Sequence, residues 1–393
     1  MRKKPGEKYR SFSKMPCAKR TRKAENKGTL HQKEEAMAKV KLDLQKEWEG
    51  RGLYQTEGLW YGVPYNPVER LTTPVSPREN LLRYYRGQDY EWLPDICSDQ
   101  IDITPFCNPD ILASGYEGGR DAFGVKWIPV EGGELPAFVE PGFQLWEDIS
   151  DWRKQPFPDP DTWNWKEEAD RYNQTYQGDD RLRRGIIMSG YFERLIANMT
   201  FEEAAMALLT DPEEVTAFFE ELTVFNEKVM KHYLEDFGCE SIMIHDDWAA
   251  QRSPFFSLDT VMELIVPHLK KLSDAAHEQG ASFTLHSCGN GLDLLPAIKA
   301  SGVDAWQLQV DAVDAATAYE RAGDDLILES YPVVPEELHG EKLENFLRET
   351  LQSFCGKHKG LVEFYDFDPE RLAETRRLTY KVSRELALSG ACR

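Results

Sequence analysis

Between residues 185 and 365 the sequence alternates short apolar segments with longer segments of helical periodicity, and this alternation limits the fold more than any other feature. The apolar segments have the length and composition of buried parallel strands. The longer segments carry helix signals, such as Asp211 and Ser257 at a start and Gly280 at an end. We expect strands at 185–189, 241–245, 283–288, 305–309, 326–330 and 361–365. Repeated βα units without a switch in pattern favour a closed parallel sheet, so we expect an α/β fold, a (βα)8 TIM-like barrel.

The part of the chain before residue 185 has a different texture. A capping box at Ser76-Pro77-Arg78-Glu79 opens a helix, and 92–96 is the expected first core strand. Residues 97–180 are rich in Pro, Gly, Asp and Trp and predict a long loop insertion with a hairpin around 123–130. We therefore expect a basic, disordered tail at 1–28, an N-terminal helical extension at 29–75 and the barrel at 76–390.

Charge is distributed unevenly along the chain. The net charge is −21, yet residues 1–30 carry eleven Lys or Arg and two Glu, which leaves about −30 on the remainder. The strongly negative charge of the residues after position 30 repels nucleic-acid phosphates. A nucleic-acid substrate is therefore not expected. The basic tail is either an interaction arm or a solvated extension.

The composition also bears on the cellular compartment. No run of about eighteen apolar residues is present, and the amino terminus lacks the pattern of a secretory signal. The seven cysteines are scattered without repeated spacing, which is typical of reduced thiols. We expect a soluble, cytoplasmic protein; the sequence leaves monomer and homodimer both open.

Polar side chains gather at the carboxyl ends of the predicted strands. In a parallel barrel these ends meet at one mouth, where such folds place their chemistry. The residues, in chain order, are His245, Asp246, Asp247, His286, Cys288, Gln307, Gln309 and Glu329. Packing alone does not explain so many ionisable groups at one edge, so we expect an active site there.

His286 and Cys288 carry the most specific chemistry of this group. On a strand their spacing of two places both side chains on one face, where an imidazole and a thiolate can share a tetrahedral zinc ion. A packed core pair is the alternative explanation of the same spacing.

Two further features favour catalysis on a planar compound. Asp246 and Asp247 are adjacent carboxylates, so one of them is expected to have a raised pKa and to act as a general acid; a helix cap or a solvated loop is the alternative. Aromatic residues at the strand ends would form flat walls for an aromatic substrate, although core packing explains part of the set. These aromatic residues are Trp248, Phe255, Phe256, Trp306, Tyr331 and Tyr365.

Several motifs resemble the uroporphyrinogen decarboxylase superfamily, and more narrowly its branch of cobalamin (corrinoid)-dependent methyltransferases. They are Pro77-Arg78-Glu79-Asn80, Asp246-Asp247-Trp248 with Gln251, His286-Ser287-Cys288-Gly289-Asn290, and Gly302-Val303-Asp304 with Trp306 and Gln309. The resemblance spans about residues 70–385, and the His-x-Cys-Gly-Asn stretch is its most specific part.

The resemblance implies a zinc-dependent enzyme that moves a methyl group between a small compound and a corrinoid protein. His286 and Cys288 would hold the zinc, and Glu329 is our choice of third ligand. Other groups that could complete the coordination are Gln309, Glu363, Asp366 and Cys355, and we assign His245, Trp248, Gln251 and Gln309 to substrate binding. The corrinoid is expected on a partner because the chain has no Asp-x-His-x-x-Gly stretch.

A plausible donor is a methoxyaromatic compound. A phenolate is a poor leaving group, so zinc as a Lewis acid and a proton from Asp246 or Asp247 would assist its departure. For a thiol, zinc would instead hold the sulfur as thiolate.

Two alternatives remain in view. A porphyrinogen decarboxylase needs an arginine-rich cleft for its carboxylated substrate, whereas residues 87–170 contain only two arginines, Arg120 and Arg153. A non-catalytic barrel that binds zinc or a corrinoid protein would have no evident use for the ionisable groups at its mouth.

Overall fold

A computed structural model describes residues 46–47, 49–55, 59–60, 63–64, 68–130, 137–330, 334–354, 360–362 and 368–391. The chain divides into two units, residues 1–45 and 46–393, and all features below belong to the second unit. The tail at 1–28 and residues 29–45 of the expected helical extension therefore lie outside the described residues. The same is true of Tyr331, Cys355, Glu363, Tyr365 and Asp366.

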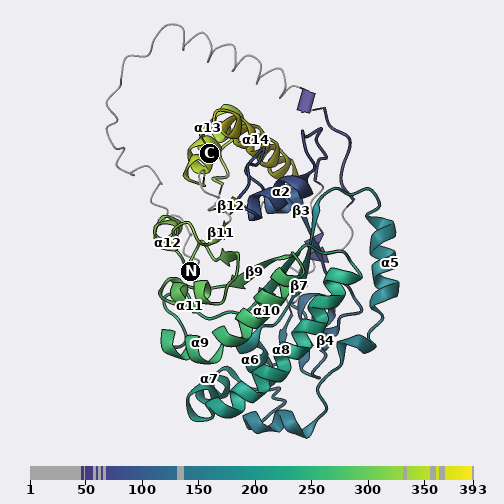
Figure 1. The fold of residues 1–393 in the computed structure, drawn as a ribbon, viewed down its shortest axis with the longest axis vertical. Coiled ribbons are helices and arrows are strands. Elements are labelled where there is room, and N and C mark those ends of the chain that lie inside the picture. Colours follow the sequence, from purple (N-terminus) through teal and green to yellow (C-terminus); the bar gives the residue numbers. More distant parts are fainter. Residues whose placement is uncertain are drawn as a thin grey trace, which may run out of the picture. The chain divides into compact units, whose positions relative to one another are not determined.

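Seven parallel strands form the main sheet and follow one another in chain order, as the alternating pattern predicts. They are β3 (Gln100–Ile103), β7 (Leu182–Ile187), β8 (Ser241–His245), β9 (Ser282–Ser287), β10 (Ala305–Leu308), β11 (Ile327–Ser330) and β12 (Gly360–Val362). Every neighbouring pair is parallel. The sheet curls with helices around it, which confirms the TIM-like α/β class (Figure 1). Within the described residues the order runs from β3 to β12 without an eighth strand.

Helices follow the strands as expected for βα units. The main ones are α2 (Pro77–Tyr85), α5 (Trp165–Thr175), α6 (Tyr191–Asn198), α7 (Phe201–Thr210), α8 (Pro212–Glu235), α9 (Leu258–Leu264), α10 (Val266–Glu278), α11 (Leu295–Ala300), α12 (Ala315–Ala322), α13 (Gly340–Phe354) and α14 (Pro369–Leu388). Ser257 caps α9 as predicted, and the helix that follows starts anew beside Pro267. In Figure 1, α8 and α10 lie along the sheet, where they contact β7 and β9.

The first core strand differs from the prediction. Residues 92–96 are not a strand: Trp92 is buried and its indole N–H donates to Asp99, while Asp95 caps a short helix, α3 (Ile96–Asp99). The first strand of the sheet is β3, directly after this helix. The side chains of the two aspartates accept hydrogen bonds from nearby N–H groups, so this apolar segment forms a capped helix and not a strand of the sheet.

Smaller elements complete the region before β7. The predicted hairpin is present as β4 (Gly119–Arg120) and β5 (Lys126–Ile128), to which β6 (Phe138–Val139) adds a third antiparallel strand. Two short helices, α4 (Pro109–Leu112) and α3, flank β3. In the described part of the predicted helical extension, β1 (Leu59–Trp60) pairs with β2 (Val63–Pro64).

Helix α2 covers the amino ends of the strands. The Arg78 N–H donates to the Asp180 carbonyl just before β7, and the Tyr84 hydroxyl bonds Gly360 at the start of β12. The Tyr85 hydroxyl reaches into the barrel to Glu329 on β11. One helix thus spans the barrel floor, leaving the carboxyl ends as the open side.

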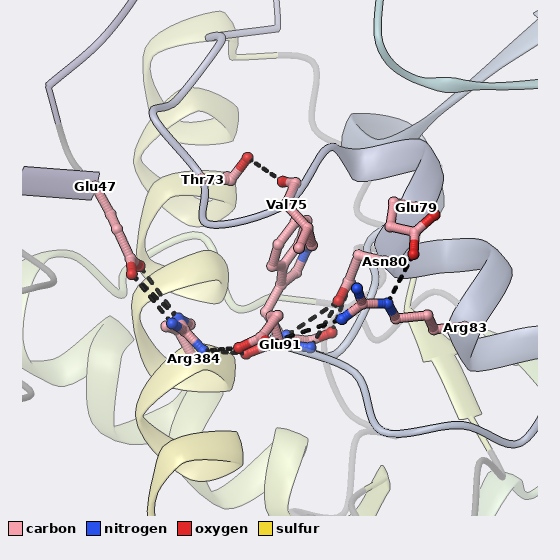
Figure 2. A network of polar contacts seen from close by, with 9 residues as sticks. Glu47, Thr73, Val75, Glu79, Asn80, Arg83, Glu91 and Arg384 are labelled. Atoms are coloured by element: carbon pink, nitrogen blue, oxygen red, sulfur yellow. Dashed lines mark hydrogen bonds and ion pairs between the residues drawn. The ribbon is translucent and has the colours of Figure 1, made fainter.

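The last helix is tied to the start of the unit by buried charges. Figure 2 shows the Arg384 guanidinium between the carboxylates of Glu47 and Glu91, at 3.1 and 2.6 Å. Asn80 of α2 accepts the Glu91 N–H and donates to the Trp92 carbonyl, which joins this network to α2.

Among the described residues, no helix combines the length and the apolar character that a membrane span requires.

Gly185 on β7 lies against the ring of Tyr233 on α8. A Cβ on Gly185 would come within 2.4 Å of the Tyr233 Cγ. We predict that Gly185→Ala lowers the free energy of unfolding by about 1–3 kcal/mol because the core is overpacked. Urea unfolding measures the change. Gly115→Ala is the control, because its Cβ would meet nothing nearer than the Met188 Cε at 4.0 Å; equal unfolding midpoints for both variants would contradict this packing.

Candidate metal centre

Strand β9 delivers two soft donors to the open side of the barrel, as the spacing of two predicts. His286 lies in the strand and Cys288 directly after it, and the Cys288 Sγ is 3.3 Å from the His286 Nε2. Two such ligands on one tetrahedral zinc ion would be about 3.5 Å apart, given ordinary Zn–S and Zn–N distances. The two donors are thus already spaced for a shared ion.

Asp247 adds a third donor from the loop after β8. Its Oδ1 accepts the Cys288 N–H at 2.6 Å, so the carboxylate is held against the end of β9. The ligand atoms of Asp247, His286 and Cys288 all lie within 4.8 Å of one another, and all three residues are half-buried. In the described ranges, no other set of three His, Cys, Asp or Glu side chains meets this criterion. A thiolate, an imidazole and a carboxylate are the ligand types of zinc, and three protein ligands leave a position for substrate.

The loops that carry these donors are fastened to each other. Gly289 has a φ of +78°, and a Cβ there would lie 2.1 Å from the Ala249 carbonyl oxygen, so only glycine fits this turn. The Asn290 N–H donates to the Ala250 carbonyl at 2.8 Å. The loops after β8 and β9, which carry Asp247 and Cys288, are therefore held in a fixed relation to each other.

Two glutamines assigned to substrate binding hold these loops. The Gln309 Oε1 accepts the Gly289 N–H at 2.8 Å, and the exposed Gln251 donates to the Asp311 carbonyl at 2.8 Å. Both amides thus have structural partners beside the centre.

Asp246, predicted as a catalytic acid, is fully buried and faces the start of α6. Its Oδ1 accepts the Glu193 N–H at 2.9 Å and its Oδ2 accepts the indole N–H of Trp248 at 2.8 Å. Gly190 allows this close approach, since a Cβ there would be 2.5 Å from the Asp246 Cβ. Burial raises the pKa of Asp246 to about 7, although these hydrogen bonds oppose the shift. Of the roles considered from the sequence, a helix cap describes its contacts best.

The predicted aromatic walls are divided between core and surroundings. Trp248 and Trp306 are almost fully buried, so their rings pack in the core. Phe255 and Phe256 are half-buried and pack against Phe192 of α6. An aromatic substrate thus receives less support from these side chains than the sequence suggests.

His245 and Glu329 lie in the barrel interior. The His245 ring lies beside that of His286, with ring centres 4.5 Å apart and planes tilted by 31°. Burial, followed by the charges of His286 and Arg184, lowers the pKa of His245 well below the ordinary value. Glu329, predicted as a zinc ligand, pairs with Arg184 at 3.1 Å and is not part of the three-donor group. Asp247, which the sequence analysis predicted as catalytic, is the third member of that group instead.

Glu193 is a residue that the sequence analysis missed. It lies in the first turn of α6, and burial together with the charges of Asp247 and Asp246 raises its pKa well above the ordinary value. It follows the carboxyl end of β7 by six residues, so extending the search into the first turn of each following helix would have found it.

The carboxyl groups of Asp247 and Glu193 influence the pKa of the Cys288 thiol. Burial and the negative charges of Asp247 and Glu193 raise the pKa of Cys288 to about 12. A divalent cation bound beside the sulfur would reverse this effect and favour the thiolate. The electrostatics of the site therefore fit a metal ion.

Comparison with known proteins gives a family match over this part of the chain. Residues 190–328 match the uroporphyrinogen decarboxylase (URO-D) family, a segment that contains Glu193 and all three donors. A curated relative, the methylated-thiol–coenzyme M methyltransferase of Methanosarcina mazei, is 30% identical over 169 residues. That match covers 40% of this chain and 44% of the relative, so the chain spans less than half of the relative's length.

Comparison with solved structures bears on the fold. A methyltransferase from Methanosarcina mazei superimposes with a TM-score of 0.50 at 14% identity, covering 80% of this chain and 98% of that one. A sugar phosphate isomerase/epimerase from Parabacteroides distasonis reaches a TM-score of 0.35 at 10% identity, over 64% of this chain and 83% of that one. The first of these supports the barrel-like architecture.

The neighbouring aspartates should respond differently to the same substitution. Asp246→Asn places an amide N–H against one of two N–H donors, so we predict a loss of about 1–3 kcal/mol in the free energy of unfolding of metal-free protein. Asp247→Asn keeps an oxygen for the Cys288 N–H, so stability should change by less than about 0.5 kcal/mol while zinc affinity falls. Urea unfolding and competition with a chromogenic chelator measure the two effects. The reverse pattern would contradict these assignments.

Proposed function

Because residues 190–328 match the uroporphyrinogen decarboxylase family, we propose that this chain is a zinc-dependent methyltransferase. It would move a methyl group between a small methylated compound, plausibly a methoxyaromatic one, and the corrinoid of a partner protein in the cytoplasm. The observation that supports this most is the group of Asp247, His286 and Cys288 at the open side of the barrel.

The chain's own residues supply the parts that demethylation of an ether requires. A zinc ion held by the three donors would act as a Lewis acid toward the ether oxygen. The methyl group would pass to the cobalt(I) of the partner's corrinoid as the C–O bond breaks, and the bonding electron pair would stay on the oxygen. That oxygen then needs a proton.

Glu193 is the proposed proton donor. Burial and the neighbouring charges of Asp247 and Asp246 raise its pKa well above the ordinary value, which favours the protonated form that a general acid needs, and its electrostatic influence reaches the Cys288 thiol. Asp246 is occupied by N–H donors at the start of α6, and Asp247 faces the other metal donors. Among the three carboxyl groups, Glu193 is therefore best placed for general acid catalysis.

A methylated thiol is the second candidate donor, because the curated relative is a methylated-thiol methyltransferase. The same metal centre would hold the departing sulfur as a thiolate. A thiolate is a better leaving group than a phenolate or alkoxide, so this reaction would depend less on Glu193.

A carboxylated porphyrinogen fits the site poorly. Asp247 places an acidic side chain among the donors at the open side of the barrel, where a substrate rich in carboxylates would be repelled. We therefore keep decarboxylation of a porphyrinogen as the less favoured function.

We predict that the purified protein holds about one zinc ion per chain and that His286→Ala and Cys288→Ala each lose it. Elemental analysis measures the metal. His277→Ala and Cys97→Ala are matched controls, since His277 bonds Asp304 on the surface and Cys97 lies beside the α3 cap. Zinc retained in full by both site variants would refute the centre.

We predict that Glu193→Gln lowers methyl transfer from a methoxyarene to cob(I)alamin by about 10²–10⁴-fold, the usual contribution of a general acid. Transfer from a methylated thiol should fall much less. The rate of methylcobalamin formation, followed by absorbance with each donor, measures both. A zinc-loaded protein that transfers methyl from neither donor would contradict the proposed function, and equal losses with both would contradict the role of Glu193.

A further inference from the structure

A row of four polar side chains crosses the interior of the barrel. In the strand register His245 pairs with His286, His286 with Gln307, and Gln307 with Glu329, so the four occupy one level of the sheet. The interior of such a barrel is ordinarily filled by branched apolar side chains. Polar groups here need a role that offsets the cost of burying them.

The contacts along this row have a fixed direction. The Gln307 Oε1 lies 2.6 Å from the His286 Nδ1, and the Gln307 Nε2 donates to the Glu329 Oε2 at 3.4 Å. Both Glu329 oxygens already accept hydrogen bonds, from Arg184, Tyr85 and Thr284, so the donor end of the Gln307 amide, its nitrogen, faces Glu329. The amide oxygen then faces His286, whose Nδ1 must carry the proton.

Surrounding donors hold the Glu329 carboxyl group in place. Arg184 donates to its Oε2 at 3.1 Å, and the hydroxyls of Tyr85 and Thr284 donate to its Oε1 at 3.1 and 3.2 Å. Arg184 is itself held by a second carboxylate, Asp102, at 2.8 and 3.2 Å. Glu329 is completely buried, so water does not compete for these contacts.

We propose that Glu329 and Gln307 are positioning residues that set the tautomer of His286. With the proton on Nδ1, the lone pair of Nε2 points to the side of Cys288, where the metal would bind. The opposite tautomer would aim an N–H at that position and block coordination. This inference rests on the metal centre proposed above, and it gives Glu329 a role behind the ligand in place of direct coordination.

Gln307→Met tests the chain of contacts from Glu329 through Gln307 to His286, here called the relay, because methionine has a similar length and no amide. We expect its affinity for zinc to fall by about 10–100-fold, the usual effect of removing a partner of a metal-bound histidine. Competition with a chromogenic chelator gives the dissociation constant, and circular dichroism verifies the fold. Thr284→Val is the matched control: it removes one hydrogen bond to Glu329 and leaves the Gln307 amide in place, so its affinity should stay within about threefold of wild type.

A second measurement needs no variant. Histidine labelled with ¹⁵N in metal-free wild type should show His286 protonated at Nδ1, with the signal identified by its loss in His286→Ala. Protonation at Nε2, or equal affinity of Gln307→Met and wild type, would overturn the proposal. If wild type binds no zinc, the metal centre fails, while the tautomer measurement still decides the relay.

Discussion

The parallel pairing of β8 with β9 is the constraint on which the site depends. Their register places His245 beside His286, so the two strands end at nearly the same level of the sheet. The loop after β8 then reaches the loop after β9, where Asp247 accepts the Cys288 N–H. A shift by one residue would turn His286 to the opposite face and separate the three donors.

Burying acids without nearby cations is unfavourable, and the structure treats each carboxyl group differently. Asp246 is compensated by the N–H groups at the start of α6, and Glu329 by Arg184. Burial, followed by the charges of Asp247 and Asp246, raises the pKa of Glu193. Asp247 has a backbone partner and lies beside a thiol and an imidazole, which together suit a divalent ion. Under the proposed function, similar side chains would thus serve as a cap, a metal ligand and a proton donor because their surroundings differ.

Sequence reasoning succeeded where the signal was local. The alternation of apolar segments predicted the parallel strands, and the spacing of His286 and Cys288 predicted that their side chains meet. It was wrong about the strand at 92–96, where aspartate caps prevailed over apolar character. The contact of Asp246 with Glu193 and that of Glu329 with Arg184 join distant segments, so neither could be read from their own neighbours in the chain.

The same limit explains Glu193 and the glutamines. Glu193 reaches the site because Asp246 anchors the helix that carries it, a contact between segments fifty-three residues apart. Gln307 has the same side chain as Gln309, two positions away on the chain, yet one faces His286 and the other holds Gly289. Only the path of the chain after each strand distinguishes such roles.

X-ray absorption at the zinc edge of the wild-type protein tests the central claim most directly. The account predicts one sulfur ligand at about 2.3 Å together with nitrogen and oxygen ligands at about 2.0–2.2 Å. Two or more sulfur ligands, or a zinc ion without sulfur, would contradict a centre built from Asp247, His286 and Cys288.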